Sequence, residues 1–280
     1  MNEILERINQ KISVVSDEIS DDFLEVSKFA NSLFLKNFEL RSFSEGRFPD
    51  IHESTLQQLL YLKDQFNYNY TLISPGFFKH EIEDSIKTEK QLNKFNQCLT
   101  LAKKLGVKIV STFTFKRTSP HSDIPNDIYT PLLRLKNLCE ANSLALLIEN
   151  SPNCWANNAK NLLDITDFTG LQANWDPGNS LKSGFSNHNV LLPRLLPITK
   201  NIHLKNWEPI KGYCSILSGS YDLASEIKYF LEHDYTGYFC IEHHQWNNRK
   251  VSTLKNYHEL KKIFHDAIDL DILPENINIS

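Results

Sequence analysis

Short runs of apolar residues alternate with longer amphipathic stretches along the whole chain. The apolar runs have the length and the β-branched content of strands. The longer stretches return to an apolar residue every three or four positions, as helices with one buried face do; clear examples are residues 21–34, 88–106, 129–143 and 221–235. Eight strands are predicted, at residues 11–16, 37–43, 70–74, 107–113, 144–149, 171–175, 201–205 and 237–242.

This repeated βα order predicts an α/β protein, a closed (β/α)8 TIM barrel. An open doubly wound sheet has the same element order, but the phosphate-binding GxGxxG motif is missing after the first strand. Gly106 ends a predicted helix just before a strand, where a left-handed cap is expected. We expect one barrel domain over residues 1–280, with short terminal extensions at about 1–10 and 266–280, because no Gly/Ser/Pro-rich linker divides the chain.

Four of the later predicted strands end in residue types that bind metals. These are Glu149, Asp176, His203 and Glu242. In a barrel of parallel strands the carboxyl ends of all strands meet at one mouth, so these side chains are expected to lie together. Alternation along LALLIE places Glu149 on the inward face and Ile148 on the face toward the helices.

Three carboxylates in one place repel one another unless a cation or protons compensate them. Oxygen ligands with one imidazole suit Mn²⁺, Mg²⁺, Co²⁺ or Zn²⁺, and we favour one Mn²⁺ ion. The ordinary alternative is that both glutamates are solvated strand ends, Asp176 begins a turn, and His203 is a packed histidine. Four such ends on successive units favour the metal site.

The composition is that of a globular protein, with 41% hydrophobic and 23% charged residues. The net charge is -4 and the charges are well mixed, which argues against nucleic acid as a partner. Neither a secretory signal nor a membrane-spanning segment is predicted. The five cysteines are scattered without a CxxC pair, which argues against disulfides, and the expected compartment is the cytoplasm.

The chain resembles the sugar phosphate isomerase/epimerase superfamily, the xylose-isomerase-like TIM barrels, over nearly its whole length. The segments that carry the resemblance are ISVVSDEIS, FELRSF, LLIENSP, NWDPGNS, IHLKNW and GYFCIEHH. The resemblance implies that Glu149, Asp176, His203 and Glu242 bind one divalent metal ion. It also implies that Glu149 and Glu242 are the acid/base pair of a ketose epimerase mechanism, in which a proton beside a carbonyl is removed through a metal-stabilised enediolate.

Two positions depart from the ketose epimerases of that superfamily. Asn179 stands where they carry a substrate-binding histidine, and Pro209 stands where they carry an arginine. The superfamily's three-zinc apurinic endonucleases need further histidines that this chain lacks, and the acidic net charge also disfavours DNA. The ketose specificity of those relatives is therefore not transferred.

Further polar residues near strand ends are candidates for substrate binding, each with a structural alternative. The candidates are Glu39, Arg41, Asn179, Lys205, Trp207 and His244. Glu39 and Arg41 share one strand face, where an internal ion pair is the alternative. Glu18 is a candidate for the mouth, but Ser16, Asp17 and Ser20 beside it favour a helix-start cluster for this segment. The pair Lys116 and Arg117 is a candidate for phosphate, or solvated surface.

We therefore predict a metal-dependent isomerase or epimerase of a small sugar-like hydroxy-carbonyl compound. Two alternatives remain open: a dehydratase of the inosose or dehydroshikimate type, and a non-catalytic barrel that binds a sugar or a protein partner. The sequence indicates a small-molecule substrate and leaves its identity, its phosphorylation and the oligomeric state open.

Overall fold

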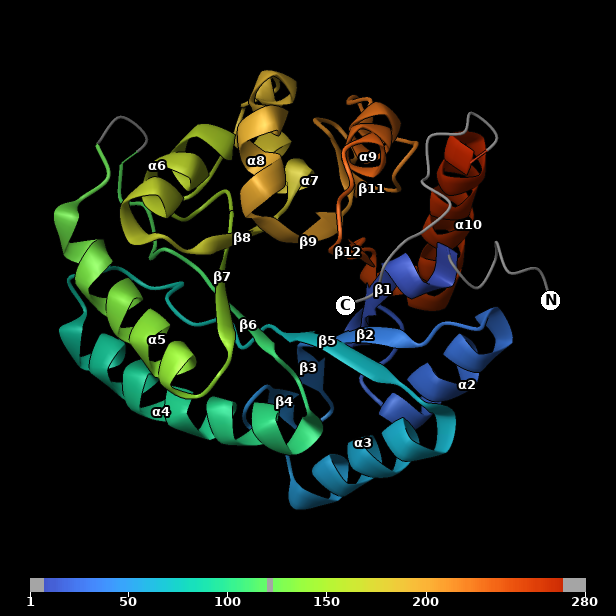
Figure 1. Ribbon diagram of the computed structural model, residues 1–280, viewed down its shortest axis with the longest axis horizontal. Coiled ribbons are helices and arrows are strands. Elements are labelled where there is room, and N and C mark those ends of the chain that lie inside the picture. The colour runs from blue at the N-terminus through green and yellow to red at the C-terminus, as the bar shows by residue number, and fades with distance from the viewer. Residues whose placement is uncertain (1–7, 120–122, 269–280) are drawn as a thin grey trace.

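The computed structural model, which describes residues 8–119 and 123–268, contains a closed barrel of eight parallel strands with helices around it (Figure 1). The strand order around the barrel is β1-β12-β9-β8-β7-β6-β5-β2. Each barrel strand overlaps one of the eight predicted strands, so the predicted fold is confirmed. The strands are β1 (Ile12–Val15), β2 (Asn37–Leu40), β5 (Asn69–Ile73), β6 (Ile109–Thr112), β7 (Ala145–Glu149), β8 (Gln172–Trp175), β9 (Thr199–Leu204) and β12 (Tyr238–Ile241).

Helices connect successive strands and pack on the outside of the barrel. They are α2 (Phe23–Leu33), α3 (Glu53–Phe66), α4 (Ser85–Leu105), α5 (Tyr129–Ala141), α6 (Ala159–Thr169), α7 (Pro177–Lys182), α8 (Leu192–Ile198), α9 (Leu223–Glu232) and α10 (Arg249–Ile268). Gly106 caps α4 with φ +71°, as predicted, and its N–H bonds to the Ala102 and Lys103 carbonyls. A glycine meets this left-handed conformation without a side-chain clash.

Short elements lie around the mouth of the barrel, at the carboxyl ends of the strands. The hairpin β3 (Ser42–Phe43) with β4 (Gly46–Arg47) follows β2, and the hairpin β10 (Asn206–Glu208) with β11 (Gly212–Cys214) follows β9. The 3-10 helices are η1 (Ser16–Glu18), η2 (Asn126–Ile128), η3 (His188–Leu191) and η4 (Trp246–Asn248). These insertions supply side chains to the mouth of the barrel.

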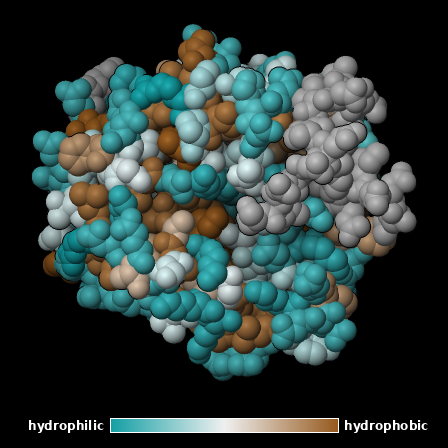
Figure 2. Space-filling model, in the orientation of Figure 1, coloured by the Kyte–Doolittle hydropathy of each residue, from teal (hydrophilic) through white to brown (hydrophobic). Residues whose placement is uncertain are grey.

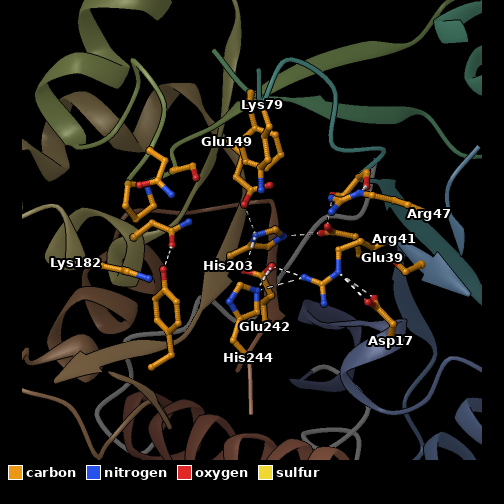
Figure 3. A pocket seen from close by; sticks show the side chains of 18 of the residues that line it. Asp17, Glu39, Arg41, Arg47, Lys79, Glu149, Lys182, His203, Glu242 and His244 are labelled. Atoms are coloured by element: carbon orange, nitrogen blue, oxygen red, sulfur yellow. Dashed lines mark hydrogen bonds and ion pairs between the residues drawn. The ribbon is translucent and has the colours of Figure 1, made fainter. Parts of the chain in front are cut away.

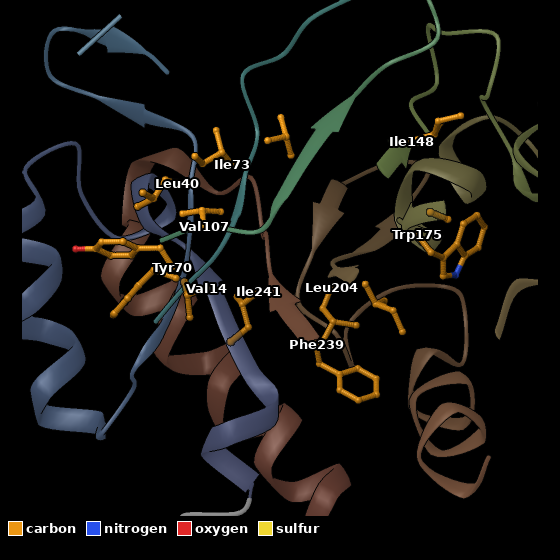
Figure 4. Close-up of a cluster of buried hydrophobic side chains, with 14 of the residues drawn as sticks. Val14, Leu40, Tyr70, Ile73, Val107, Ile148, Trp175, Leu204, Phe239 and Ile241 are labelled. Atoms are coloured by element: carbon orange, nitrogen blue, oxygen red, sulfur yellow. The ribbon is translucent and has the colours of Figure 1, made fainter. Parts of the chain in front are cut away.

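The hydrophobic core lies between the strands and the helices, as the alternation along the strands predicts (Figure 4). Val14, Leu40, Ile148, Leu204 and Ile241 all belong to it and are fully buried. Burial of this apolar surface is the main favourable contribution to folding. It also fixes which strand residues face the other way, into the barrel.

The barrel interior is unusually polar. Ser13 and Thr71 hydroxyls lie 3.1 Å apart, the Ser74 and Ser111 hydroxyls lie 2.9 Å apart, and Asn201 Nδ2 donates to Asn174 Oδ1 at 2.9 Å. Buried polar groups are tolerated when they are hydrogen-bonded, and a satisfied network has one preferred arrangement. This layer supports the residues at the mouth.

The surface mixes hydrophilic and hydrophobic residues, with the hydrophobic ones in separate groups on the face shown in Figure 2. Within the described ranges, no helix combines the length and apolar content needed to cross a membrane. All five cysteines are free and buried. In the predicted terminal extensions, Ile8 is buried in the core and α10 runs to Ile268; residues 1–7 and 269–280 lie outside the described part.

Gly178 on α7 permits a close approach to β9, and we expect its replacement to destabilise the fold. A Cβ atom at this position would lie 2.6 Å from the Lys205 carbonyl oxygen and 2.9 Å from Lys205 Cγ. Gly178→Ala should therefore lower the free energy of unfolding by about 1–3 kcal/mol in a urea titration. Lys104→Ala, an exposed change on α4, should stay within about 0.5 kcal/mol of wild type. Equal stability of both variants would contradict this packing.

Candidate active site

A cavity of about 460 Å³ opens at the carboxyl ends of the barrel strands (Figure 3). Its lining is rich in charged side chains from many different units: Asp17, Glu39, Arg41, Arg47, Lys79, Glu149, Lys182, His203, Glu242 and His244. Tyr213, Trp246 and Phe113 supply aromatic surface. Such a cavity is large enough for a small polar ligand.

The structure brings together the four residues predicted to bind a metal. Glu149 ends β7, Asp176 follows β8, His203 lies in β9 and Glu242 follows β12. Each offers one ligand atom, and these four atoms all lie within 4.8 Å of one another. All four side chains are buried. The barrel register therefore brings three carboxylates and one imidazole together, and Glu149, His203 and Glu242 line the cavity while Asp176 lies behind them.

His203 is held so that one ring nitrogen faces the carboxylates. Its Nε2 lies 2.7 Å from Glu39 Oε2, while its Nδ1 lies 3.2 Å from Glu242 and 3.5 Å from Glu149. Nδ1 is buried and has no hydrogen-bond partner among the described residues. A carboxylate that accepts one ring N–H orients a histidine so that the other nitrogen can bind a metal. Glu39, predicted to bind substrate, has this supporting position behind His203.

Asp176 caps the N-terminus of α7. Its Oδ1 accepts a hydrogen bond of 2.9 Å from the Asn179 backbone N–H, and its own N–H donates to Asn150 Oδ1 at 2.8 Å. The Asn179 side chain donates to the Asn150 carbonyl and accepts a 2.6 Å hydrogen bond from the Tyr213 hydroxyl. Asn179 therefore lines the cavity with both side-chain polar atoms already engaged.

Lys205 lies among the acidic residues and is absent from the cavity wall. Its fully buried ammonium contacts Asp176 and Glu242 at short range. Burial acts to lower the pKa of Lys205, but the two acids outweigh this and raise the pKa well above its usual value. Lys205 thus remains a cation that partly neutralises the four-residue set.

Arg41 joins three carboxylates on the other side of the cavity. Its Nε lies 3.0 Å from Asp17, its Nη2 lies 2.7 Å from Glu18, and its Nη1 lies 2.5 Å from Glu242. Glu39 contacts His203 and not Arg41, so the alternative of an internal Glu39–Arg41 ion pair is not what the structure has. Glu242 contacts both Arg41 and His203 and joins them in one network. A guanidinium suits this position because its donors lie in one plane and point in several directions.

The interpretation of Glu18 as part of a helix-start cluster is wrong. Asp22 caps α2, accepting from the Leu24 N–H at 2.9 Å, whereas Glu18 lies in the buried helix η1. The Glu18 carboxylate accepts from Arg41 and from the His244 backbone N–H at 2.9 Å. Arg41 and His243 hold the pKa of Glu18 at about 2, against the effect of burial.

The candidates His244 and Trp207 differ in whether they line the cavity. His244 lines the cavity, and its Nε2 lies 2.9 Å from Glu242 Oε1. Trp207 does not line the cavity; it packs edge-on against Tyr213, which does, with ring centroids 5.2 Å apart. Lys116 pairs with Glu81 on the surface at 3.0 Å.

Sequence reasoning missed Asp17, Arg47, Lys79 and Tyr213. Lys79 lies in a loop, and the other three lie in the short elements η1, β4 and β11. No periodic pattern predicts the direction of a side chain in such segments. The cluster of polar residues directly after the first strand was a usable signal for Asp17, because every strand end of a barrel faces the mouth.

Charge compensation keeps the two glutamates ionised. Burial acts to raise the pKa of Glu242, but His244, Lys205 and His203 hold it well below its usual range. His203 likewise lowers the pKa of Glu149 against the effect of burial. Burial raises the pKa of Asp176 to about 6, although Lys205 opposes the shift. At neutral pH all three are carboxylates.

The donor set fits a divalent cation. Three buried carboxylates leave negative charge that Lys205 and His203 offset only in part, and the buried Nδ1 of His203 faces Glu149 and Glu242, where it can act as a ligand once the ring loses its proton. Oxygen donors with one imidazole suit Mn²⁺, Mg²⁺ or Zn²⁺. Glu149, Asp176, His203 and Glu242 could thus hold such an ion, provided that the Lys205 ammonium gives way.

A family model for the xylose isomerase-like TIM barrel matches residues 32–262. The chain belongs to this family. The resemblance drawn from the strand-end motifs is confirmed, and a search of curated protein sequences finds no match. The family and the fold support a sugar-modifying enzyme.

Solved structures share the fold at low sequence identity. L-ribulose 3-epimerase has a TM-score of 0.74 at 13% identity, covering 96% of this chain and 99% of its own. The IOLI protein, solved with a zinc atom, has a TM-score of 0.74 at 16% identity, covering 92% and 98%. The probable 3-DHS dehydratase AsbF from Bacillus anthracis has a TM-score of 0.71 at 18% identity, covering 87% and 97%.

Removing the Arg41 guanidinium should destabilise the protein strongly, because Asp17, Glu18 and Glu242 would lose their shared cation. Arg41→Met should lower the free energy of unfolding by about 3–5 kcal/mol in a denaturant titration at neutral pH. Arg134→Met, which breaks an exposed pair with Glu89, should change it by less than about 1 kcal/mol. A small effect at Arg41 would show that the buried charges are compensated in another way.

Metal binding should release a proton from His203. Burial acts to lower the pKa of His203, but Glu39, Glu242 and Glu149 raise it well above its ordinary value, so the ring is protonated at neutral pH. A metal requires the neutral ring, so affinity for Mn²⁺ should rise as pH rises, up to about tenfold per pH unit while His203 is protonated.

Calorimetry in buffers of different ionisation enthalpy measures this proton release directly. His233→Gln, a change in an exposed histidine at the end of α9, should leave the released proton unchanged. An Mn²⁺ affinity that is independent of pH between about 6 and 8 would contradict the protonated His203.

Proposed function

We propose that the protein is a divalent-metal-dependent isomerase or epimerase of a small, sugar-like hydroxy-carbonyl compound. The observation that carries the proposal is the convergence of Glu149, Asp176, His203 and Glu242, three of which line a polar cavity. Two of the four are glutamates that can also move protons, which a purely structural metal site does not need.

In this proposal the four residues hold one ion, for which Mn²⁺ is our first candidate. When bound, the ion would stabilise the negative charge that develops on the oxygens of an enediolate. The protein contributes the ligand charge, the orientation of His203 by Glu39, and a polar cavity that can receive the substrate.

Glu149 and Glu242 are proposed to exchange the substrate proton. Both are ionised at neutral pH, so either can accept a proton from a carbon beside a carbonyl. Arg41 and His244 hold the Glu242 carboxylate from one side, and Lys79 contributes positive charge near Glu149. One glutamate would remove the proton and become a carboxylic acid. The other would take a proton from solvent and deliver it to the enediolate, and the first would release its proton to solvent, which inverts or relocates the stereocentre.

Other cavity residues are proposed to orient the substrate. His244 has its imidazole at the wall, and Tyr213 and Trp246 present ring surface on which the apolar face of a sugar can lie. The Lys182 ammonium lies 4.7 Å from the Tyr213 ring centroid and lines the same wall. Asn179 narrows this part of the cavity without offering a free polar atom.

The proposal predicts that Glu149→Gln and Glu242→Gln each lose turnover. A glutamine keeps the shape but neither accepts the proton nor carries the charge, so kcat should fall by about 100- to 10,000-fold. The measurement uses Mn²⁺-loaded protein with a panel of ketoses in deuterated water, and NMR detects deuterium incorporated at the carbon beside the carbonyl.

Glu232→Gln, at the exposed end of α9, is the matched control and should retain wild-type turnover. Retained exchange in either site variant would reject the two-glutamate mechanism. Loss of water from the substrate instead of simple exchange would favour a dehydratase. Failure of wild-type protein to bind any divalent ion would favour a non-catalytic barrel.

A further inference from the structure

Three cations on the cavity wall have no carboxylate partner among the described residues: Arg47, Lys79 and Lys182. Lys182 lies over the rings of Trp207 and Tyr213. Of the other two, Arg47 lies at the end of β4 and Lys79 lies in the loop between β5 and α4. Arg41 and Lys205 contact four carboxylate groups between them and share Glu242, whereas neither Arg47 nor Lys79 forms a salt bridge within the described ranges. Figure 3 shows Arg47 and Lys79 among the residues that line the cavity.

The backbone fixes the position of Arg47. Its Nε donates to the Ser74 carbonyl at 3.0 Å, which directs the guanidinium along the cavity wall. Gly76, with φ +77°, lies directly beneath it: a Cβ there would be 2.6 Å from Arg47 Nε and 2.7 Å from Cζ. A side chain at position 76 would displace the guanidinium, so this loop forms a cradle for it. The two Nη groups remain available to a ligand.

Lys79 is placed by an aromatic ring. Its ammonium lies 3.6 Å from the centroid of Phe113, and both residues line the cavity. A cation over an aromatic face is stabilised but keeps its hydrogen-bond donors free. The two basic groups therefore have defined positions and unsatisfied donors in the same cavity.

The neighbouring acids do not compensate these two charges. Burial lowers the pKa of Arg47, Arg41 lowers it further, and the attraction of Glu149 does not reverse the shift. Partial desolvation at the cavity wall and the charge of Arg47 lower the pKa of Lys79, whose side chain stays exposed. An anion that contacts both cations would supply the counter-charge that they lack.

We propose that Arg47 and Lys79 form an oxyanion-binding subsite, so that the substrate carries a carboxylate or phosphate in addition to its hydroxy-carbonyl unit. A guanidinium with two free Nη groups can bind two oxygens of either anion, and an ammonium adds a third contact. The substrate assignment rests on the proposed function, whereas anion binding itself does not.

The test measures anion binding to metal-free protein by calorimetry at constant ionic strength, with inorganic phosphate and acetate as the two probes. At least one probe should bind, and Arg47→Gln and Lys79→Gln should each weaken that binding on the order of tenfold. Preference for phosphate would indicate a phosphorylated substrate, and preference for acetate would indicate a carboxylic acid. Circular dichroism checks the fold, and Lys79→Gln alone suffices if the Arg47 variant does not fold.

Lys103→Gln removes the same charge from the last turn of α4, at the opposite end of the barrel, and should leave anion binding unchanged. Absence of binding by both probes, or equal binding by wild type and the Lys79 variant, would overturn the subsite. Because no metal or turnover is involved, these outcomes are independent of the Glu149 and Glu242 variants. If the Glu149 and Glu242 variants lose turnover and the wild-type protein binds neither anion, the proposed enzyme activity stands and the anionic substrate is rejected.

Discussion

The mouth of the barrel depends on the compensation of buried negative charge. Six carboxylates are buried there: Asp17, Glu18, Glu39, Glu149, Asp176 and Glu242. Removing so many charges from water is unfavourable unless each has a cation or several hydrogen-bond donors. Arg41, Lys205 and protonated His203 each contact at least two of these acids. The remaining negative charge is what makes the site attractive to a divalent ion.

The same constraint explains the asparagine hydrogen bonds around the site. Asn150 and Asn179 hold the loop after β8 in place around Asp176, while Asn174 and Asn201 surround the His203–Glu39 pair. Asparagine offers both a donor and an acceptor without adding charge. These uncharged asparagines therefore hold the charged groups in position. Pre-organisation of this kind favours both metal binding and proton transfer.

Sequence predicted the barrel and the four-residue set because both follow from local pattern. Apolar runs define strands, strand ends share one mouth, and alternation directs Glu149 inward, as the buried core residue Ile148 shows. Ion pairs between residues far apart in the sequence follow no such local pattern. The Asp17–Glu18 segment has the composition of a helix cap, and only the fold shows that Arg41 reaches it from β2.

The direction of side chains beyond the strand ends also could not be predicted from the sequence. Lys205 shares an alternation face with His203, yet its ammonium turns to Asp176 and Glu242 and leaves the cavity wall. Trp207 follows a strand that carries a ligand, but the hairpin β10–β11 turns it away and presents Tyr213 instead. Arg47 and Lys79 depend on loop conformation at Gly76 and on the position of Phe113.

The most direct test is a crystal structure of the protein soaked with Mn²⁺, with anomalous diffraction recorded at the manganese absorption edge. We predict one strong anomalous peak within bonding distance of Glu149, Asp176, His203 and Glu242. The Lys205 ammonium should then no longer contact both Asp176 and Glu242. Absence of a peak, with Lys205 still bridging the two carboxylates, would contradict the assignment of these residues to a metal centre.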